Sequence, residues 1–219
     1  MMTGINLEAL LVARKIADFA EKEKDLRTNR RPRVVCKHMG AVLADAVLQA
    51  GLNYHNVVRP RVLSILNSYP DMDRVSSLSK LVEKNETASF LNWGHEDKIL
   101  RFERIVRFLK NENIELVADL HSQLASEKFR KELLCIKGVG PKTADYMACL
   151  VGVESIPVDR HVRSLALSLG ITNQDYQFLQ KVFCYAADFL GVPRREFDEW
   201  IWQRQTQILS SGHQLKLAV

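Results

Sequence analysis

The stretch from 136 to 162, IKGVGPKTADYMACLVGVESIPVDRHV, constrains the fold more than any other part of the chain. Gly138 and Gly140 allow positive φ and a close backbone approach, so the Gly-Val-Gly sequence predicts a tight hairpin. Pro141 suits the first turn of a helix, where no amide hydrogen is needed. We therefore expect two helices joined by this hairpin, with Lys142 in the first turn of the second helix.

The rest of the 219-residue chain repeats an apolar helical period, and no series of alternating β-branched runs occurs in it. We therefore predict an all-α fold with about ten helices. The segment from 95 to 110 is the strongest example, with an apolar stripe of Ile99, Phe102, Ile105, Val106 and Leu109. Basic residues recur every three positions beside this stripe, and we interpret them as a solvated flank whose stems cover it: Lys98, Arg101, Arg104, Arg107 and Lys110.

The amino-terminal segment mixes charged and apolar residues, which predicts an amphipathic helix and not a signal peptide. Asn6 can cap this helix, and its expected apolar face consists of Leu7, Leu10, Leu11, Phe19 and Ala20. The basic tract from 24 to 34 predicts a solvated connection, with a phosphate contact as the alternative. No apolar run approaches the roughly 18 residues that a bilayer-spanning helix needs, so we expect no membrane association.

The composition, with 47% apolar and 26% charged residues, suits a sizeable core in one large domain or in two small lobes. The net charge of +5 mildly favours a polyanionic partner. The spacing of Cys36, Cys135, Cys149 and Cys184 matches neither a zinc ribbon nor an iron–sulfur cluster. We therefore expect reduced thiols in a cytosolic protein.

The hairpin and the residues after it also indicate chemistry. Free amides at the hairpin and the positive end of the next helix favour a phosphate oxygen, although an ordinary helix–helix turn has the same sequence. The helix dipole disfavours the ammonium form of Lys142, which favours its use as an amine nucleophile; a solvated lysine is the alternative. Asp159 follows Ile-Pro-Val and can cap the next helix, unless the fold brings it to Lys142.

LLCIKGVGPKTADYMACLVG and IPVDRHV together resemble the helix-hairpin-helix and Gly/Pro-Asp motif of the endonuclease III superfamily of DNA glycosylases. The match includes both hairpin glycines, the lysine two positions after the second glycine, and the VDxHV segment. GVGPKTAD and PVDRHV are also similar to the 8-oxoguanine glycosylase branch. Weaker similarity extends to DAVLQAGLNYHNVVRP, which resembles the helix and loop that carry the family's DNA-wedging residues, and to FLNWGHEDKILRFERI, which resembles the helix that follows.

The resemblance implies an all-α fold of two helical lobes, with the helix-hairpin-helix motif at the cleft between them. The six-helix lobe would comprise residues 35–155, and the second lobe residues 1–34 plus 156–219. It also implies a monomer that acts on double-stranded DNA in the cytoplasm, in association with the nucleoid. Because the four cysteines cannot form the family's iron–sulfur cluster, we expect no cofactor, and only a monovalent cation at the hairpin is left open.

The resemblance also implies roles for individual residues. Lys142 would be the nucleophile, and Asp159 the catalytic carboxylate that stabilises the sugar and helps to position or deprotonate the amine. The DNA backbone would lie against the hairpin at Lys137, Gly138, Val139, Gly140 and Thr143. The wedge or base pocket would come from Gln49, Asn53, Tyr54, Trp93 and Trp202, each of which also suits a structural role. Core packing is the favoured interpretation for most of the terminal-helix residues Phe197, Trp200, Ile201 and Trp202, and a structural one for His161.

The leading hypothesis is a bifunctional DNA glycosylase and abasic-site lyase of base excision repair. It would flip a damaged base out of the duplex, cleave its glycosidic bond through a Schiff base on Lys142, and nick the strand by β-elimination. The motif phrases favour 8-oxoguanine as the substrate, while oxidised pyrimidines, mismatched uracil or thymine, and alkylated purines stay open. The alternative from another class is a non-catalytic DNA-binding module that uses the hairpin as a phosphate clamp.

Overall fold

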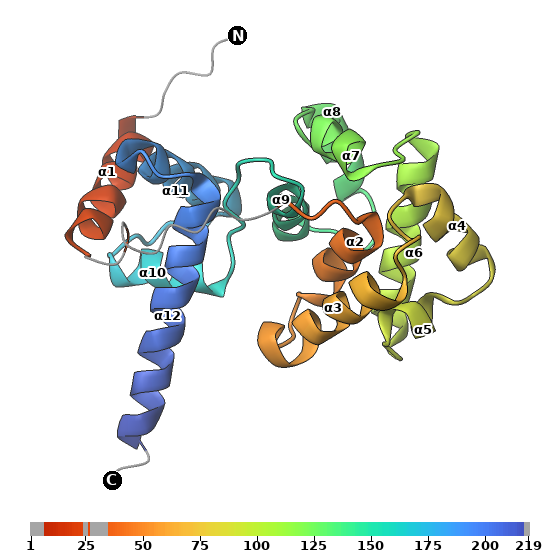
Figure 1. The fold of residues 1–219 in the computed structure, drawn as a ribbon. Coiled ribbons are helices and arrows are strands. Elements are labelled where there is room, and N and C mark those ends of the chain that lie inside the picture. The colour runs from red at the N-terminus through yellow and green to blue at the C-terminus, as the bar shows by residue number, and fades with distance from the viewer. Residues whose placement is uncertain (1–6, 24–25, 27–34, 217–219) are drawn as a thin grey trace. The chain divides into compact units, whose positions relative to one another are not determined.

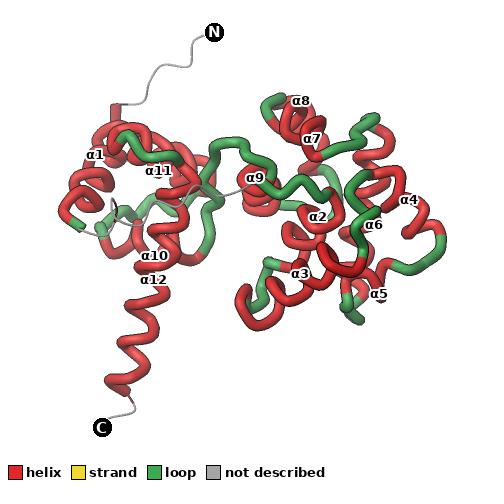
Figure 2. Tube along the Cα trace, viewed as in Figure 1, coloured by secondary structure: helices red, strands yellow, loops and turns green. Residues whose placement is uncertain are grey.

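The computed structural model describes residues 7–23, 26 and 35–216, with side chains through residue 207. Helices dominate these residues, and no strand occurs among them (Figure 1, Figure 2). The all-α prediction is confirmed. The proposed cap Asn6 and most of the basic tract from 24 to 34 lie outside the described residues. Within the described ranges, no helix combines the length and the apolar character needed to cross a bilayer.

The chain divides into two compact units, each with its own apolar core. Unit 1 comprises Met1–Arg33 and Glu154–Val219, and unit 2 comprises Val34–Val153.

Unit 1 contains α1 (Leu7–Lys22), α10 (Arg160–Ser168), α11 (Tyr176–Leu190) and α12 (Arg194–Lys216). Helices α1 and α11 lie side by side (Figure 1). The buried face of α1 consists mainly of alanine: Ala9, Ala13, Ile16, Ala17 and Ala20. The predicted apolar face is therefore wrong for Leu7 and Leu11, which are 69% and 64% exposed. The small alanine side chains let the two helices approach closely, and this turns the leucines outward.

The carboxyl-terminal helix α12 anchors itself in unit 1 through aromatic packing. Phe197, Trp200 and Ile201 are buried, and the rings of Phe197 and Trp200 stack with their centroids 5.5 Å apart. The packing role predicted for these three residues is confirmed. Trp202 is only half-buried, and its ring meets the edge of the buried His161 of α10 at 6.4 Å.

Unit 2 contains eight α-helices and one π-helical turn among the described residues. They are α2 (Met39–Leu48), the π-helical turn η2 (Tyr54–Val58), α3 (Arg59–Ser68), α4 (Val75–Glu83), α5 (Thr87–Leu91), α6 (Glu96–Asn111), α7 (Val117–Leu124), α8 (Glu127–Leu134) and α9 (Pro141–Leu150). Helix α2 is buried along its whole length and contacts α3, α4, α6 and α9. Gly40 makes this possible on one side, because a Cβ there would lie 2.8 Å from the Met72 carbonyl oxygen. Unit 2 is therefore built around α2.

The predicted apolar stripe of α6 is confirmed, since Phe102, Ile105, Val106 and Leu109 are all buried. The basic residues beside it divide into two groups. Arg107 and Lys110 are exposed and pair with acidic side chains, as a solvated flank would. That interpretation is wrong for Lys98 and Arg101, which turn toward α2 and toward the hairpin before α9.

Candidate functional site

The predicted hairpin joins α8 to α9. Gly138 has φ +94°, as expected, and the amide of Val139 closes the turn by donating to the Ile136 carbonyl oxygen at 2.9 Å. The Val139 side chain is buried, which fixes the hairpin to the core of unit 2. Gly140, in contrast, has an extended backbone with φ −102° and serves as the N-cap of α9. Positive φ therefore explains glycine at 138 and not at 140.

Several amides at the hairpin have no acceptor among the described residues. They belong to Gly138, Gly140, Lys142 and Thr143, while Pro141 between them has no amide hydrogen. A Cβ added at Gly140 would meet no atom within 4 Å, so this face of the backbone is open. Free amides at the positive end of a helix favour an anion such as a phosphate.

Two arginines of α6 lie against the hairpin. Arg104 donates from Nη1 to the Lys137 carbonyl oxygen at 3.5 Å. The Arg101 guanidinium passes over Gly138, where a Cβ would lie only 2.5 Å from Nε. This Nε is buried and has no hydrogen-bond acceptor in the described part of the chain. Sequence reasoning missed both contacts, although the three-residue spacing of the basic side chains was a visible signal.

Lys142 is the second residue of α9 and is half-buried. Its ammonium forms no hydrogen bond or ion pair with any described residue. The neighbouring Thr143 is buried, and Lys137 is exposed on the hairpin. The amine of Lys142 is therefore not occupied by a structural contact in unit 2 and is available for chemistry.

Asp159 belongs to unit 1 and is the N-cap of α10. Its Oδ1 accepts from the amides of His161 at 2.7 Å and Val162 at 3.0 Å. The predicted cap is confirmed. Oδ2 has no partner among the described residues, so one oxygen of this half-buried carboxylate stays available. The structure thus describes Lys142 and Asp159 each within its own unit.

The wedge candidates of unit 2 differ in how their side chains are used. Gln49 is the C-cap of α2, and its Nε2 is buried without an acceptor in the described residues. Asn53 caps η2, with Oδ1 accepting from the Asn56 amide at 2.9 Å. Trp93 packs against the core of unit 2, and the Arg61 guanidinium lies 5.2 Å from its ring centroid.

Lys98 fixes the end of α2 that carries Gln49. Its Nζ donates to the carbonyl oxygens of Val47 at 3.1 Å, Leu48 at 3.3 Å and Ala50 at 2.8 Å. Burial, and to a lesser extent the charge of Arg101, lower the pKa of Lys98 from 10.5 to about 8. This lysine therefore supports the candidate wedge, a role that the sequence did not reveal.

A carboxylate that sequence reasoning missed lies within α2. Asp45 is buried, and its Oδ1 accepts from the hydroxyl of Tyr146 at 3.0 Å. Its Oδ2 accepts from the hydroxyl of Tyr54, another wedge candidate, at 3.3 Å. Tyr146 belongs to α9, so this carboxylate links the candidate wedge segment to the helix of Lys142.

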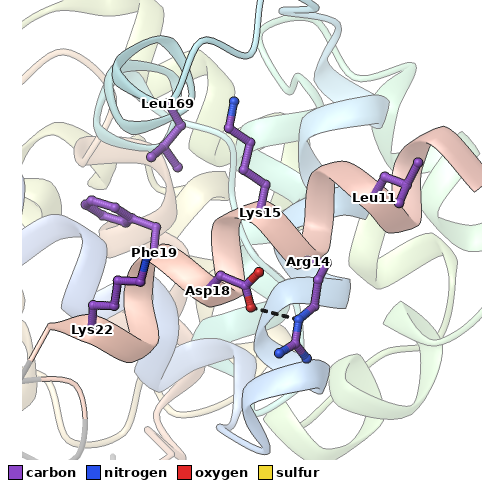
Figure 3. Close-up of a pocket in the computed structure, with 7 residues that line it drawn as sticks. All are labelled: Leu11, Arg14, Lys15, Asp18, Phe19, Lys22 and Leu169. Carbon is purple, nitrogen blue, oxygen red and sulfur yellow. Dashed lines mark ion pairs between the residues drawn. The ribbon is translucent and has the colours of Figure 1, made fainter.

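An open groove of about 400 Å³ lies along α1 in unit 1 (Figure 3). Its walls are Leu11, Arg14, Lys15, Asp18, Phe19, Lys22 and Leu169. Arg14 and Asp18 pair at 2.7 Å across one side of it. None of the predicted site residues lines this groove.

The cysteines lie apart in the fold. Cys149 and Cys184 are buried in the cores of units 2 and 1, Cys36 is half-buried and Cys135 is exposed. Across the described ranges, no three His, Cys, Asp or Glu side chains gather as a metal site requires. A monovalent cation at the hairpin stays a prediction.

Comparison with known proteins identifies the fold. No protein-family model matches the chain, and no curated protein matches it. Among solved structures it is similar to H. pylori 3-methyladenine DNA glycosylase (MagIII), whose crystal structure contains 1,N6-ethenoadenine. The match covers 93% of this chain and 98% of that one, with a TM-score of 0.53 and 17% sequence identity. The chain therefore shares the fold of this DNA glycosylase. At this identity the likeness concerns the fold alone.

Proposed function

We propose that this chain is a DNA glycosylase with abasic-site lyase activity that acts in base excision repair. One observation carries the proposal: Lys142, with an unoccupied amine, stands in the first turn after an open Gly-Val-Gly hairpin, within a DNA glycosylase fold. The open amides suit a DNA phosphate, which would bring the amine close to the sugar of a neighbouring nucleotide. A DNA-binding module without enzymatic activity needs the hairpin but not the lysine.

The sugar carbon that bears the base is inaccessible in a stacked duplex, so the damaged nucleotide would be flipped out. The neutral amine of Lys142 attacks this carbon, and the bond to the base breaks with its electron pair leaving on the base. The available Oδ2 of Asp159 would stabilise the positive charge on the sugar and accept a proton from the amine. The C1′–O4′ bond of the sugar ring then opens, and O4′ takes up a proton, which leaves a protonated Schiff base between C1′ and Lys142. This Schiff base permits β-elimination, in which a proton leaves C2′ and the 3′ phosphate departs.

The backbone contacts proposed for the hairpin follow from its geometry. The amides of Gly138, Gly140 and Thr143 are open, and Lys137 is exposed beside them. Val139 would act differently, because its amide closes the turn and its side chain anchors the hairpin. We propose double-stranded DNA as the partner of this surface and a monomer as the active form.

A modified purine is the proposed substrate. The phrases GVGPKTAD and PVDRHV favour 8-oxoguanine, because they are similar to the 8-oxoguanine glycosylase branch. An alkylated or etheno-bridged adenine is the second candidate, because the protein of similar fold binds 1,N6-ethenoadenine. Oxidised pyrimidines and mismatched uracil or thymine complete the set of lesions to compare.

A panel of duplexes, each with one of these lesions, tests the proposal. Base release is read from strand cleavage after alkali, and lyase activity from cleavage without it. Borohydride should reduce the Schiff base and trap a covalent adduct between the protein and DNA. Lys142→Ala should abolish this adduct, while the matched control Lys137→Ala, an exposed lysine on the same hairpin, should still form it.

Two results would contradict the proposal. An adduct that persists in Lys142→Ala would mean that another amine attacks the sugar. Binding to damaged DNA without base release or adduct, for every lesion in the panel, would favour the non-catalytic module. Salt dependence does not separate the two readings, because both predict phosphate contacts.

A further inference from the structure

Asp45 is a buried carboxylate in the central helix of unit 2, with only 5% of its surface exposed. All of the other residues of α2 are apolar. Burying a carboxylate is costly unless hydrogen bonds compensate for the lost water. Here the hydroxyls of Tyr146 and Tyr54 each donate to one of its oxygens, at 3.0 Å and 3.3 Å.

The three members of this network lie next to three residues of the candidate site. Tyr146 follows Lys142 by one turn of α9, and Gln49 follows Asp45 by one turn of α2. Residues four apart lie on the same face of a helix, so each pair shares a face. Tyr54 directly follows Asn53 at the start of η2. The carboxylate therefore connects the segment with the nucleophile to both segments with wedge candidates.

Hydrogen bonds to a carboxylate are directional, and apolar packing is not. Apolar contacts alone would let α9 slide or rotate slightly against α2. Two hydroxyl groups aimed at opposite oxygens of one carboxylate fix both the rotation and the height of Tyr146 relative to Tyr54. Lys98 fixes the end of α2 from another side, by donating to the carbonyl oxygens of its last two residues and of Ala50, two residues beyond it.

We propose that Asp45 is a positioning residue for the lysine chemistry. Through Tyr146 and Tyr54 it holds the Lys142 face of α9 in a set position relative to the wedge segment. Wedge insertion and amine attack would then act on the same nucleotide. This inference rests on the proposed function, because it assigns a role in the attack by Lys142. Misplacing a reactive group by about 1 Å can slow a reaction by about a hundredfold, so a small shift of α9 matters.

A duplex with one preformed abasic site is the suitable probe, because it needs no knowledge of the lesion. The rate of covalent trapping by borohydride is measured in a single turnover, with the protein saturating. Tyr146→Phe removes one hydroxyl and keeps the ring, and we expect trapping to slow about tenfold. Affinity for the abasic duplex should change less than about twofold, because phosphate binding is untouched. Tyr54→Phe and Asp45→Asn should also slow trapping.

Two control variants separate positioning from stability. Asp145→Asn alters a second buried carboxylate, next to Tyr146 on α9, which pairs with Arg130 of α8. It should lower the melting temperature and leave the trapping rate unchanged. Tyr69→Phe removes a tyrosine hydroxyl in the same unit that has no hydrogen-bond partner among the described residues, and it should change neither quantity.

The outcomes distinguish the two proposals. If the native protein forms no adduct with abasic DNA, the proposed function fails, and the role of Asp45 fails with it. If the native protein traps DNA and Tyr146→Phe traps it equally fast, Asp45 is a structural contact and the positioning role alone is refuted. If Asp45→Asn does not fold, Tyr146→Phe decides, since it loses one oxygen atom only. Trapping slowed in Tyr146→Phe but not in Asp145→Asn supports the role.

Discussion

The two hairpin glycines lie two residues apart, and the structure predicts different effects when each is replaced by alanine. Gly138 has φ +94°, where a side chain costs about 1–2 kcal/mol. A Cβ there would also lie 2.5 Å from Nε of Arg101, which would have to move. Gly138→Ala should therefore lower the free energy of unfolding by at least about 1–2 kcal/mol. For a chain of this size the melting temperature would fall by roughly 2–4 °C per kcal/mol.

Gly140 has φ −102° and open space around its Cα, so alanine fits there without strain. Alanine restricts the unfolded chain more than glycine does, but glycine is the better N-cap residue. These two effects oppose each other, so Gly140→Ala should change the free energy of unfolding by less than about 1 kcal/mol. The added methyl group would occupy the open face where we propose that a DNA phosphate lies. Losing a hydrogen bond to a charged oxygen costs about 1.5–3 kcal/mol, so DNA affinity should fall about ten- to hundredfold.

Thermal unfolding followed by circular dichroism, and DNA binding followed by fluorescence anisotropy at fixed salt, measure the two effects. Gly140→Ala should keep a stability close to that of the native protein and bind DNA more weakly. Native affinity in Gly140→Ala would refute the phosphate contact at the hairpin. Native stability in Gly138→Ala would refute the hairpin conformation itself.

Three further predictions follow from the site. Asp159→Asn should slow base release and leave DNA affinity and stability close to native, because asparagine is also a good helix cap. Asp175→Asn, at the N-cap of α11, is the control, and it should keep the native rate of base release. The pKa of Lys98 is about 8 in the folded protein and 10.5 when exposed, so the unfolded chain binds more protons between these values. The contribution of Lys98 to the free energy of unfolding should therefore increase as pH rises from 8 to 10.5. The increase should be less than about 1.4 kcal/mol per pH unit, because water screens the partly exposed amine. Melting curves of Lys98→Met, measured over the same pH range, should lack this increase. Arg101→Gln should reduce the slope of log affinity against log salt concentration by about one, because its guanidinium lies at the hairpin that we propose binds a phosphate. Arg107→Gln, on the exposed flank of α6, should leave this slope unchanged.

Features set by local sequence could be predicted well. The helical period correctly predicted the apolar stripe of α6. The Gly-Val-Gly-Pro motif correctly predicted the hairpin and the start of α9. Asp159 was expected as a helix cap, and it is one. Each of these features depends on residues within about one turn of each other, so their physical cause is visible in the sequence.

Features set by tertiary partners could not be predicted in this way. Which face of α1 is buried depends on how closely α11 approaches. The close approach buries the alanines of α1 and leaves the larger Leu7 and Leu11 exposed. In the sequence, Lys98 is one of several basic residues at a regular spacing on α6. Only the structure shows that the end of α2 lies beside it. The role of Asp45 is not visible in the sequence, where it is a single polar residue in an apolar helix. Its two tyrosine partners are 9 and 101 residues away in the chain.

The cap of α10 also has an entropic consequence. A free carboxylate rotates about its last bond between broad, nearly equivalent positions. Two backbone amides hold Oδ1 of Asp159 in place, so Oδ2 is held in one direction before any substrate arrives. Less rotational freedom then has to be lost as positive charge develops on the sugar. The same two hydrogen bonds that begin the helix thereby preorganise the oxygen proposed to stabilise the transition state.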